Sequence, residues 1–388
     1  MKNLIKITIG LIMIFAFKIL SQFKKFKFFH LYSSRIGHLA LNFDAALLSV
    51  EKNTIIIFIT DKTISNNFIL DFYKKQKKVF FINSSFMLKI FYCMHLANSN
   101  SSMILNFKKV QPDFSFQLGH KSKINFPRYS KTKLNSIFTK YNLNNNFVGF
   151  HSRNNLYMKK NNSINDKNYH GYRNFDFKDY YLAASYLKKK YSIIKLGSSY
   201  KEENIENLKK IFGNKIFTSI DFASNEEIDY LINAYSAYNI IGSSGIGEVS
   251  SILRKKNVIV NLIPFSLNRL SYCSPNSIIV PKKIFDLKKN RFLKFKEVLN
   301  INFSLHTSKD PYKQNQLKFV NNTPEEILNA VIEMEEKIEG INQYEIKKFN
   351  EIFWNKITNS DDYKINYLKN ILKLSISNYF LKKNKDLF

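Results

Sequence analysis

Cysteine is scarce in this chain, which has two among its 388 residues, Cys93 and Cys273. Two thiols cannot build a disulfide framework or a four-ligand zinc site, so disulfide-rich and zinc-ribbon folds are excluded. We expect both to be buried free thiols in a reducing compartment. The seven histidines form no HExxH pattern, and no Asp-x-Asp follows a predicted strand. We therefore expect chemistry that uses neither a metal nor an organic cofactor.

Acidic residues are also few, with 30 against 60 lysines and arginines, so the formal net charge is +30. Such a charge suggests a nucleic-acid partner, but residues with A/T-rich codons dominate throughout, and genome composition alone explains the excess. No known RNA- or DNA-binding motif occurs, so we predict no specific nucleic-acid partner. Weak attraction to an anionic membrane surface or to phosphate ligands is still expected.

Arginine is rarer than lysine, at seven of the 60 basic residues. In a lysine-dominated chain, arginine is expected where a planar fork with two parallel donors is needed. Three of the seven, Arg35, Arg153 and Arg173, lie in segments that carry other candidate functional residues.

The first 27 residues form a hydrophobic and basic segment. An apolar run at residues 7–17 lies between Lys6 and Lys18, and a basic-aromatic stretch follows at 23–29. The run is short for a spanning helix, although snorkelling lysines would lengthen it. We predict membrane association, through either a single anchor spanning residues 4–20 or an interfacial helix. A docking helix and a signal peptide are the alternatives, and the positive flank predicts a cytoplasmic body.

The rest of the chain alternates short apolar runs with amphipathic stretches, which is typical of βαβ units and a parallel sheet. We predict an N-terminal domain at 28–145, a second domain at 146–342, and C-terminal helices with a tail at 343–388. The expected strands are 29–32, 54–60, 78–82, 147–150, 192–196, 215–220, 238–241, 257–261 and 277–280. The expected helices are 37–50, 66–73, 85–97, 179–190, 202–212, 226–235, 247–255, 323–338 and 344–357. Residues 98–145 look irregular and are interpreted as a linker.

Two segments end strands in polar residues, where parallel sheets bind ligands. The first ends in His151-Ser152-Arg153, in which Arg153 is suited to grip a diphosphate and His151 shares its side of the strand. The second is a glycine-rich turn that starts a helix, where backbone N–H groups attract phosphate oxygens. Its candidate residues are Ser243, Ser244, Gly245, Gly247 and Glu248. Glu248 would bond ribose hydroxyls or favour the helix dipole.

Two further segments carry candidate positioning residues. In the first strand-to-helix turn, His38 is either a general base or part of the helix start. Arg35 and Asn42 flank it and would position the acceptor or the donor. The loop at 169–174 carries Tyr172 and Arg173 and would close over a ligand, unless it is only a surface loop.

The order and spacing of these segments resemble a family of bacterial glycosyltransferases of surface-carbohydrate loci. The matching segments are 35–39, 150–153, 172–174, 197–198 and 242–245, followed by a similar tail at 322–328. The resemblance covers about residues 29–340. Gly197 is followed by serine where the family usually has aspartate, and Glu248 lies outside the family pattern.

The resemblance implies an α/β chain of GT-B type, with two Rossmann-like domains facing a cleft. The His-x-Arg strand end is similar to that of fucosyltransferases, in which the arginine holds a donor diphosphate, and Gly197 would lie on the donor side. It further implies an inverting hexosyl- or deoxyhexosyltransferase that uses a GDP- or UDP-sugar, with His38 as base. The acceptor would be a glycan or a lipid-linked sugar of polysaccharide biosynthesis, at the cytoplasmic face of a bacterial inner membrane.

Two other functions stay open. A nucleotide-sugar epimerase can share this fold, and Glu248 is the residue that favours it. A non-catalytic basic module on membrane or nucleic acid would instead show steeply salt-dependent binding that survives loss of His38 and Arg153.

Overall fold

The computed structural model divides the chain into two compact units, residues 1–127 and 128–388. It describes residues 1–105, 119–122, 124, 129–153, 171–197, 216–218, 225–301, 316–341, 343–357 and 366–388. The division falls earlier in the chain than the expected boundary after residue 145, and the predicted domain limits stay predictions.

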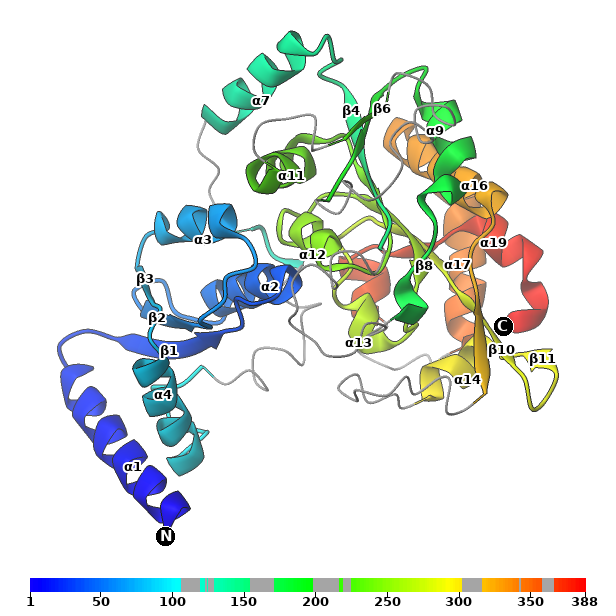
Figure 1. The fold of residues 1–388 in the computed structure, drawn as a ribbon. Helices are drawn as coiled ribbons and strands as arrows, with labels where there is room; N and C mark the ends of the chain where they lie inside the picture. Colours follow the sequence, from blue (N-terminus) through cyan, green and yellow to red (C-terminus); the bar gives the residue numbers. More distant parts are fainter. Residues whose placement is uncertain are drawn as a thin grey trace. The chain divides into compact units, whose positions relative to one another are not determined.

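Unit 1 is built on a three-stranded parallel sheet in the order β1-β2-β3 (Figure 1). Its strands are β1 (Phe26–Leu31), β2 (Ile55–Thr60) and β3 (Val79–Ile82). A helix follows each strand: α2 (Ile36–Leu48), α3 (Asn67–Lys74) and α4 (Ser85–Ala97). The predicted alternation of strands and helices around a parallel sheet is confirmed here.

Alternating aromatic residues of β1 place helices on both faces of this sheet, because successive side chains of a strand point to opposite faces. Phe28 lies 4.6 Å, ring to ring, from Phe17 of α1 (Lys2–Leu20). Phe29 faces the other way and contacts Phe58 at 5.9 Å. Phe58 in turn contacts Phe43 of α2. The predicted apolar N-terminal helix is therefore present, and it packs against the sheet.

Unit 2 is built on a seven-stranded sheet in the order β13-β9-β8-β7-β4-β5-β6, and all of its pairs are parallel. Its strands are β4 (Phe147–His151), β5 (Ser192–Lys195), β6 (Ile216–Thr218), β7 (Asn239–Ile241), β8 (Asn257–Leu262), β9 (Ile278–Pro281) and β13 (Ser375–Ile376). From β4 the chain adds β5 and β6 on one side, and β7, β8 and β9 on the other. The β4–β7 junction is therefore a topological switch point, where open parallel sheets bind ligands.

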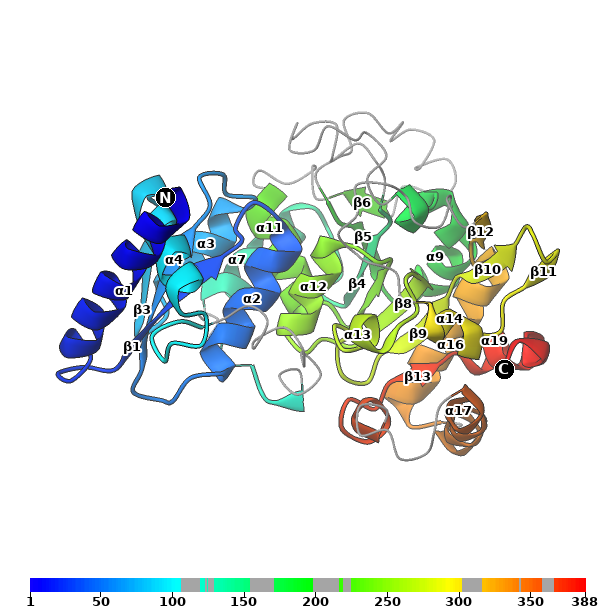
Figure 2. The ribbon, with the colours of Figure 1, turned by 90° about the horizontal axis from the view of Figure 1, so that it is seen from below.

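Helices cover both faces of this sheet. On one face lie α7 (Tyr129–Lys140), α11 (Asn225–Tyr235) and α12 (Gly245–Ile252), and on the other α9 (Tyr181–Leu187) and α16 (Pro324–Glu339) (Figures 1 and 2). The remaining described α-helices are α13 (Leu267–Leu270), α14 (Phe295–Asn300), α17 (Gln343–Ile357) and α19 (Asn378–Lys383). The helix expected at 179–190 opens with the 3-10 turn η2 (Phe177–Tyr180), and the one expected at 202–212 lies outside the described residues.

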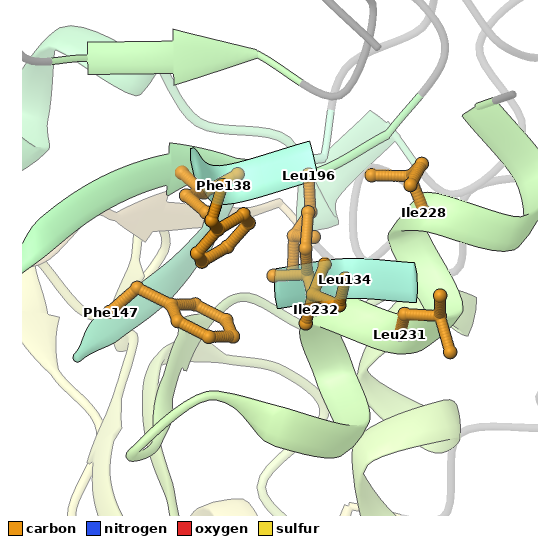
Figure 3. Packing of buried hydrophobic residues seen from close by; sticks show 8 residues of the cluster. Leu134, Phe138, Phe147, Leu196, Ile228, Leu231 and Ile232 are labelled. Carbon is orange, nitrogen blue, oxygen red and sulfur yellow. The ribbon is translucent and has the colours of Figure 1, made fainter. Parts of the chain in front are cut away.

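Helix α7 corrects the interpretation of residues 98–145 as irregular throughout. Its sequence is mostly polar, but Leu134 and Phe138 lie four residues apart and are buried. They pack with Phe147 of β4 and with Ile228 and Ile232 of α11 (Figure 3). Burial of these two side chains stabilises a helix whose propensity alone is weak.

Two features flank the large sheet. A small antiparallel sheet of β11 (Arg291–Phe292), β10 (Lys283–Asp286) and β12 (Leu317–Val320) was not expected from the sequence. The predicted start of α16 is confirmed by a capping box, in which the Glu326 amide donates to Thr323 Oγ1 at 3.2 Å and the Thr323 amide to Glu326 Oε2 at 3.0 Å.

Candidate functional site

The carboxyl ends of the unit 2 strands collect basic and polar side chains. His151 ends β4, Lys195 ends β5, and Lys282 directly follows β9. The glycine-rich turn follows β7, and α12 begins after its N-cap, Ser244. Parallel strands end at one edge of a sheet, so these residues share one edge.

Two of the predicted segments meet at the switch point. His151 Nδ1 lies 3.1 Å from Ser244 Oγ, and the Gly242 amide donates to the His151 carbonyl at 3.1 Å. The ring of Phe175 lies against Gly242, where a Cβ would come within 2.4 Å of Phe175 Cε1. Glycine at 242 therefore allows this aromatic side chain to cover the turn.

Arg153 is held at the same edge by the segment that precedes α9. Its Nη1 donates to Asn174 Oδ1 at 2.6 Å, and its carbonyl accepts from the Phe175 amide at 3.3 Å. Lys282 Nζ donates to the carbonyls of Tyr172 and Asn174 at 2.9 and 3.0 Å. The short 3-10 turn η1 (Gly171–Arg173) is thus fastened beside Arg153. The preceding residues of that loop, Tyr169 and His170, lie outside the described residues.

Lys195 and Lys282 are buried cations that the sequence analysis missed, since lysine is too common in this chain to stand out. Burial lowers the pKa of Lys195 to about 7 and that of Lys282 to about 8. Lys195 Nζ also lies 4.4 Å from the ring centroid of Phe177, a contact that favours its charged form. The useful signal was position, because each lysine stands where a buried strand ends.

His151 contributes a polar group to this edge and no charge. Burial lowers its pKa to about 3, and the positive charges of Lys195 and Arg153 add to the effect. The imidazole is therefore neutral near pH 7, while Arg153 keeps its charge. One guanidinium and two titrating ammonium groups make this edge suited to an anion with several oxygens.

Within the glycine-rich turn, several groups are engaged inside the protein. Ser243 Oγ accepts from the Ile263 amide at 3.1 Å, and the Gly247 amide donates to the Ser244 carbonyl at 3.1 Å. Gly245 starts the helix after Ser244. The Ser243 contact fixes the turn against the residue that follows β8, and Ser244 Oγ contacts His151 at the sheet edge.

Glu248 forms a buried ion pair with Arg269 of α13, which the sequence analysis did not single out. Burial raises the pKa of Glu248, although the charges of Arg269 and Arg173 oppose the rise. Arg173 lies 5.6 Å from the ring of Tyr172, and its buried Nε has no hydrogen-bond partner among the described residues. The Glu248 carboxylate is therefore occupied by protein groups.

Gly197 has φ 105°, in the left-handed region that glycine adopts readily, and its amide donates to Asp229 Oδ1 at 2.9 Å. Ser198, the family departure next to it, lies outside the described residues.

The predicted residues of unit 1 lie at the start of α2. Arg35 is the exposed N-cap residue, and His38 lies in the first helical turn, so His38 is not the cap. The ring of His38 lies 6.1 Å from that of Tyr32. Asn42 is buried, and neither atom of its amide has a hydrogen-bond partner in the described part of the chain.

A second histidine lies at the carboxyl edge of the unit 1 sheet. His30 Nε2 lies 2.9 Å from Asp61 Oδ1, and Tyr92 Oη lies 3.1 Å from His30 Nδ1. Asp61 Oδ2 accepts from the Ser34 amide at 3.0 Å. Burial raises the pKa of Asp61, but hydrogen bonds from His30 and Ser34 outweigh it and hold that pKa below its usual value. An ionised Asp61 accepts from the Nε2–H of His30.

No local pattern indicates this cluster, because His30 lies inside an apolar strand and its partners are far away in the chain. Burial raises the pKa of Tyr92 to about 12, with additions from Tyr32 and Asp61. Tyr32 lies 4.2 Å, ring to ring, from His30 and 6.1 Å from His38, so its ring is close to both of these imidazoles. Among the described residues, no group of three or more His, Cys, Asp or Glu side chains is placed to hold a metal ion.

No protein family and no curated protein sequence matches this chain. Among solved structures, it is similar to a family 9 glycosyl transferase from Veillonella parvula, at 10% identity over 66% of this chain and 86% of that one, with a TM-score of 0.43. It is also similar to the ADP-heptose LPS heptosyltransferase II of E. coli, at 10% identity over 80% and 99%, with a TM-score of 0.46. The iron-containing dodecameric glycosyltransferase TibC of E. coli gives 12% identity over 81% and 79%, and a TM-score of 0.43. Because these sequence identities and TM-scores are low, the assignment of function rests on the geometry of the site itself.

Proposed function

We propose that this chain is a glycosyltransferase that takes a sugar from a nucleoside-diphosphate donor and passes it to a hydroxyl of a glycan or lipid-linked acceptor. One observation carries the proposal: Arg153, Lys195 and Lys282 lie at the carboxyl edge of the unit 2 sheet, around the switch point. The motif order that resembles surface-carbohydrate glycosyltransferases agrees with it. The donor is a GDP- or UDP-linked hexose or deoxyhexose, and the product enters polysaccharide biosynthesis.

The chemical task at this edge is to stabilise a leaving diphosphate. As the bond between the anomeric carbon and the diphosphate oxygen breaks, the electron pair stays on that oxygen. Arg153 then meets the developing negative charge with a fixed positive charge, and the two lysines add to it in their protonated forms. Such electrostatic stabilisation is usually the largest contribution to this kind of catalysis. The start of α12 adds oriented N–H groups. Side chains would in this way replace a divalent cation, and transfer should continue in EDTA.

The acceptor hydroxyl must lose a proton as its oxygen attacks the anomeric carbon. We assign the role of the base that accepts this proton to His38 of unit 1. Attack on the side opposite the leaving group inverts the anomeric centre. His30 is the second candidate base, favoured by its contact with Asp61 at 2.9 Å. Loss of transfer in His38→Ala with donor binding intact would support the first base. Normal transfer in His38→Ala combined with a loss in Asp61→Asn would assign the step to His30.

The first experiment is a thermal-shift screen of the full chain against GDP-, UDP-, CMP- and dTDP-sugars. A ligand that binds only the folded state at 100 times its Kd stabilises that state by about 2.7 kcal/mol. We expect one donor class to raise the Tm of the wild type and to lose that effect in Arg153→Ala. If no nucleotide sugar moves the Tm, or if Arg153→Ala responds like the wild type, the donor site is wrong.

Two outcomes would favour the other functions. Conversion of the nucleotide sugar without any acceptor, followed by NMR, would indicate an epimerase. That function has lost its main support, because the Glu248 carboxylate is paired with Arg269. Binding to anionic polymers that survives both His38→Ala and Arg153→Ala would indicate a non-catalytic basic module.

A further inference from the structure

Helix α1 is fixed to unit 1 by one of its faces (Figure 1). Met13, Ile14 and Phe17 pack against the cluster that contains Phe28 of β1 and Phe91 of α4. On the same face Gly10 is buried, and a Cβ there would lie 2.1 Å from the carbonyl oxygen of Cys93 in α4. Backbone thus meets backbone where α1 crosses α4, which requires glycine at 10.

The opposite face of α1 is apolar and uncovered. Phe15 is 68% exposed and Ile12 61%, although both are large hydrophobic residues. Helix α4 continues this surface with Phe86, which is 68% exposed. We call this set the α1–α4 surface, and its members are Leu4, Ile5, Ile9, Leu11, Ile12, Phe15, Ile19, Phe86 and Leu96. Large apolar side chains exposed on two neighbouring helices are typical of an interaction site.

The charges beside the α1–α4 surface select its partner. Neither α1 nor α4 contains an acidic residue, whereas Lys2, Lys6 and Lys18 lie on α1 and Lys89 on α4. Lys24 and Lys25 follow α1. A second copy of this chain would bring the same positive charges to the contact and would be repelled. An anionic bilayer offers both an apolar layer and the opposite charge.

We propose that the α1–α4 surface inserts into the headgroup boundary of an anionic lipid bilayer, with α1 lying along the membrane and not crossing it. By length and composition alone α1 could span a membrane. A spanning α1 would have to leave α4 and strip Met13, Ile14 and Phe17 from the core. Helix α4 cannot accompany it, because 13 residues reach about 20 Å while the hydrocarbon core is about 30 Å thick.

Vesicle co-sedimentation of the purified full chain tests the partner, and it does not depend on any sugar-transfer activity. We expect binding to vesicles of phosphatidylcholine mixed with phosphatidylglycerol, and at least tenfold weaker binding to phosphatidylcholine alone. Ile12→Asn combined with Phe15→Asn should lose this binding, since both side chains point away from the protein. The control is Leu287→Asn, which removes a side chain of similar exposure (54%) from unit 2 and should bind like the wild type. Unchanged binding of the double variant, or a double variant that only converts a dimer to a monomer, would overturn the proposal.

The orientation of α1 is tested by labelling with a membrane-impermeant maleimide. Asn3→Cys and Gln22→Cys place thiols at the two ends of α1, and their labelling is measured above that of the parent chain. A helix lying along the membrane leaves both thiols accessible in intact vesicles. A spanning helix would protect the Asn3→Cys thiol until detergent is added, and that result would refute the proposed orientation.

Discussion

His151 Nδ1 and Ser244 Oγ lie 3.1 Å apart, although 93 positions separate the two residues in the chain. The contact joins the ends of β4 and β7, the neighbouring strands between which the order of the sheet reverses. The guanidinium of Arg153 follows two residues after this imidazole. The proposed donor site is therefore organised by sheet topology, and its parts can be tested one at a time.

Arg153→Lys separates charge from geometry. A lysine keeps the positive charge but loses the planar fork that grips two oxygens at once. We expect kcat/KM for sugar transfer to fall by about 100- to 1,000-fold, equal to about 2.7–4 kcal/mol of transition-state stabilisation. Arg291→Lys is the control, because Arg291 makes an exposed pair with Glu297 away from the sheet edge. Equal kcat/KM for both variants would rule out a bidentate role for Arg153.

Gly242→Ala tests the cover over the glycine-rich turn. The added methyl would lie 2.4 Å from Phe175 Cε1, so the ring must shift, and overpacking of this kind costs about 1–3 kcal/mol. Gly247→Ala is the matched control, since its methyl would meet only the flexible end of Ile241 at 2.9 Å. Urea unfolding of unit 2 should show the larger loss in Gly242→Ala, together with weaker donor binding. Equal stabilities would mean that Phe175 moves without cost.

The pH dependence of donor binding should reveal the buried lysines. The pKa of Lys195 is lowered to about 7 and that of Lys282 to about 8, so both lose positive charge as the pH rises through this range. A diphosphate prefers the protonated forms, and its affinity should fall between about pH 7 and pH 9. Arg153 keeps its charge and His151, whose pKa is lowered to about 3, stays neutral in this range. Calorimetric titration of Lys195→Met should therefore show a flatter profile, and an unchanged profile would exclude Lys195.

Asp61→Asn should weaken unit 1 in a pH-dependent way. The pKa of Asp61 is lower in the folded state than in the unfolded chain, because His30 and Ser34 bond its ionised form. Its stabilisation is therefore present above about pH 4, the unfolded pKa, and is lost as the pH falls through the folded pKa. Thermal unfolding should show the variant less stable at pH 7 by about 1–3 kcal/mol, with the gap closing in acid. A gap that stays constant down to pH 2 would contradict this linkage.

The sequence was sufficient for those elements whose own residues settle their structure. The β-branched run of β2, the capping box at Thr323 and the small residues after β7 are local signals, and each led to the observed element. Helix α7 could not be predicted in this way, because it depends on burial of Leu134 and Phe138 against residues distant in the chain.

The residues of the candidate sites also fall into those that local sequence signals predict and those that depend on distant contacts. Arg153 was found because arginine is rare here, whereas Lys195 and Lys282 are two lysines among many and are distinguished by burial and by their positions at strand ends. The environment of His30 is set by its contact with Asp61, 31 residues later in the chain. That of Glu248 is set by its ion pair with Arg269, 21 residues later. Pairs of this kind form when strands and helices pack together, so local sequence patterns do not predict them.

Lys282 uses two of its three N–H groups on the carbonyls of Tyr172 and Asn174. An ammonium group can rotate about its C–N bond, but two hydrogen-bond acceptors hold the Lys282 group in one orientation. Its third N–H therefore points in a fixed direction. An incoming anion that takes this hydrogen would stiffen the same nitrogen that fastens η1. Because this nitrogen already fastens the Tyr172 backbone, capture of the ligand would not have to meet the entropy cost of ordering that backbone.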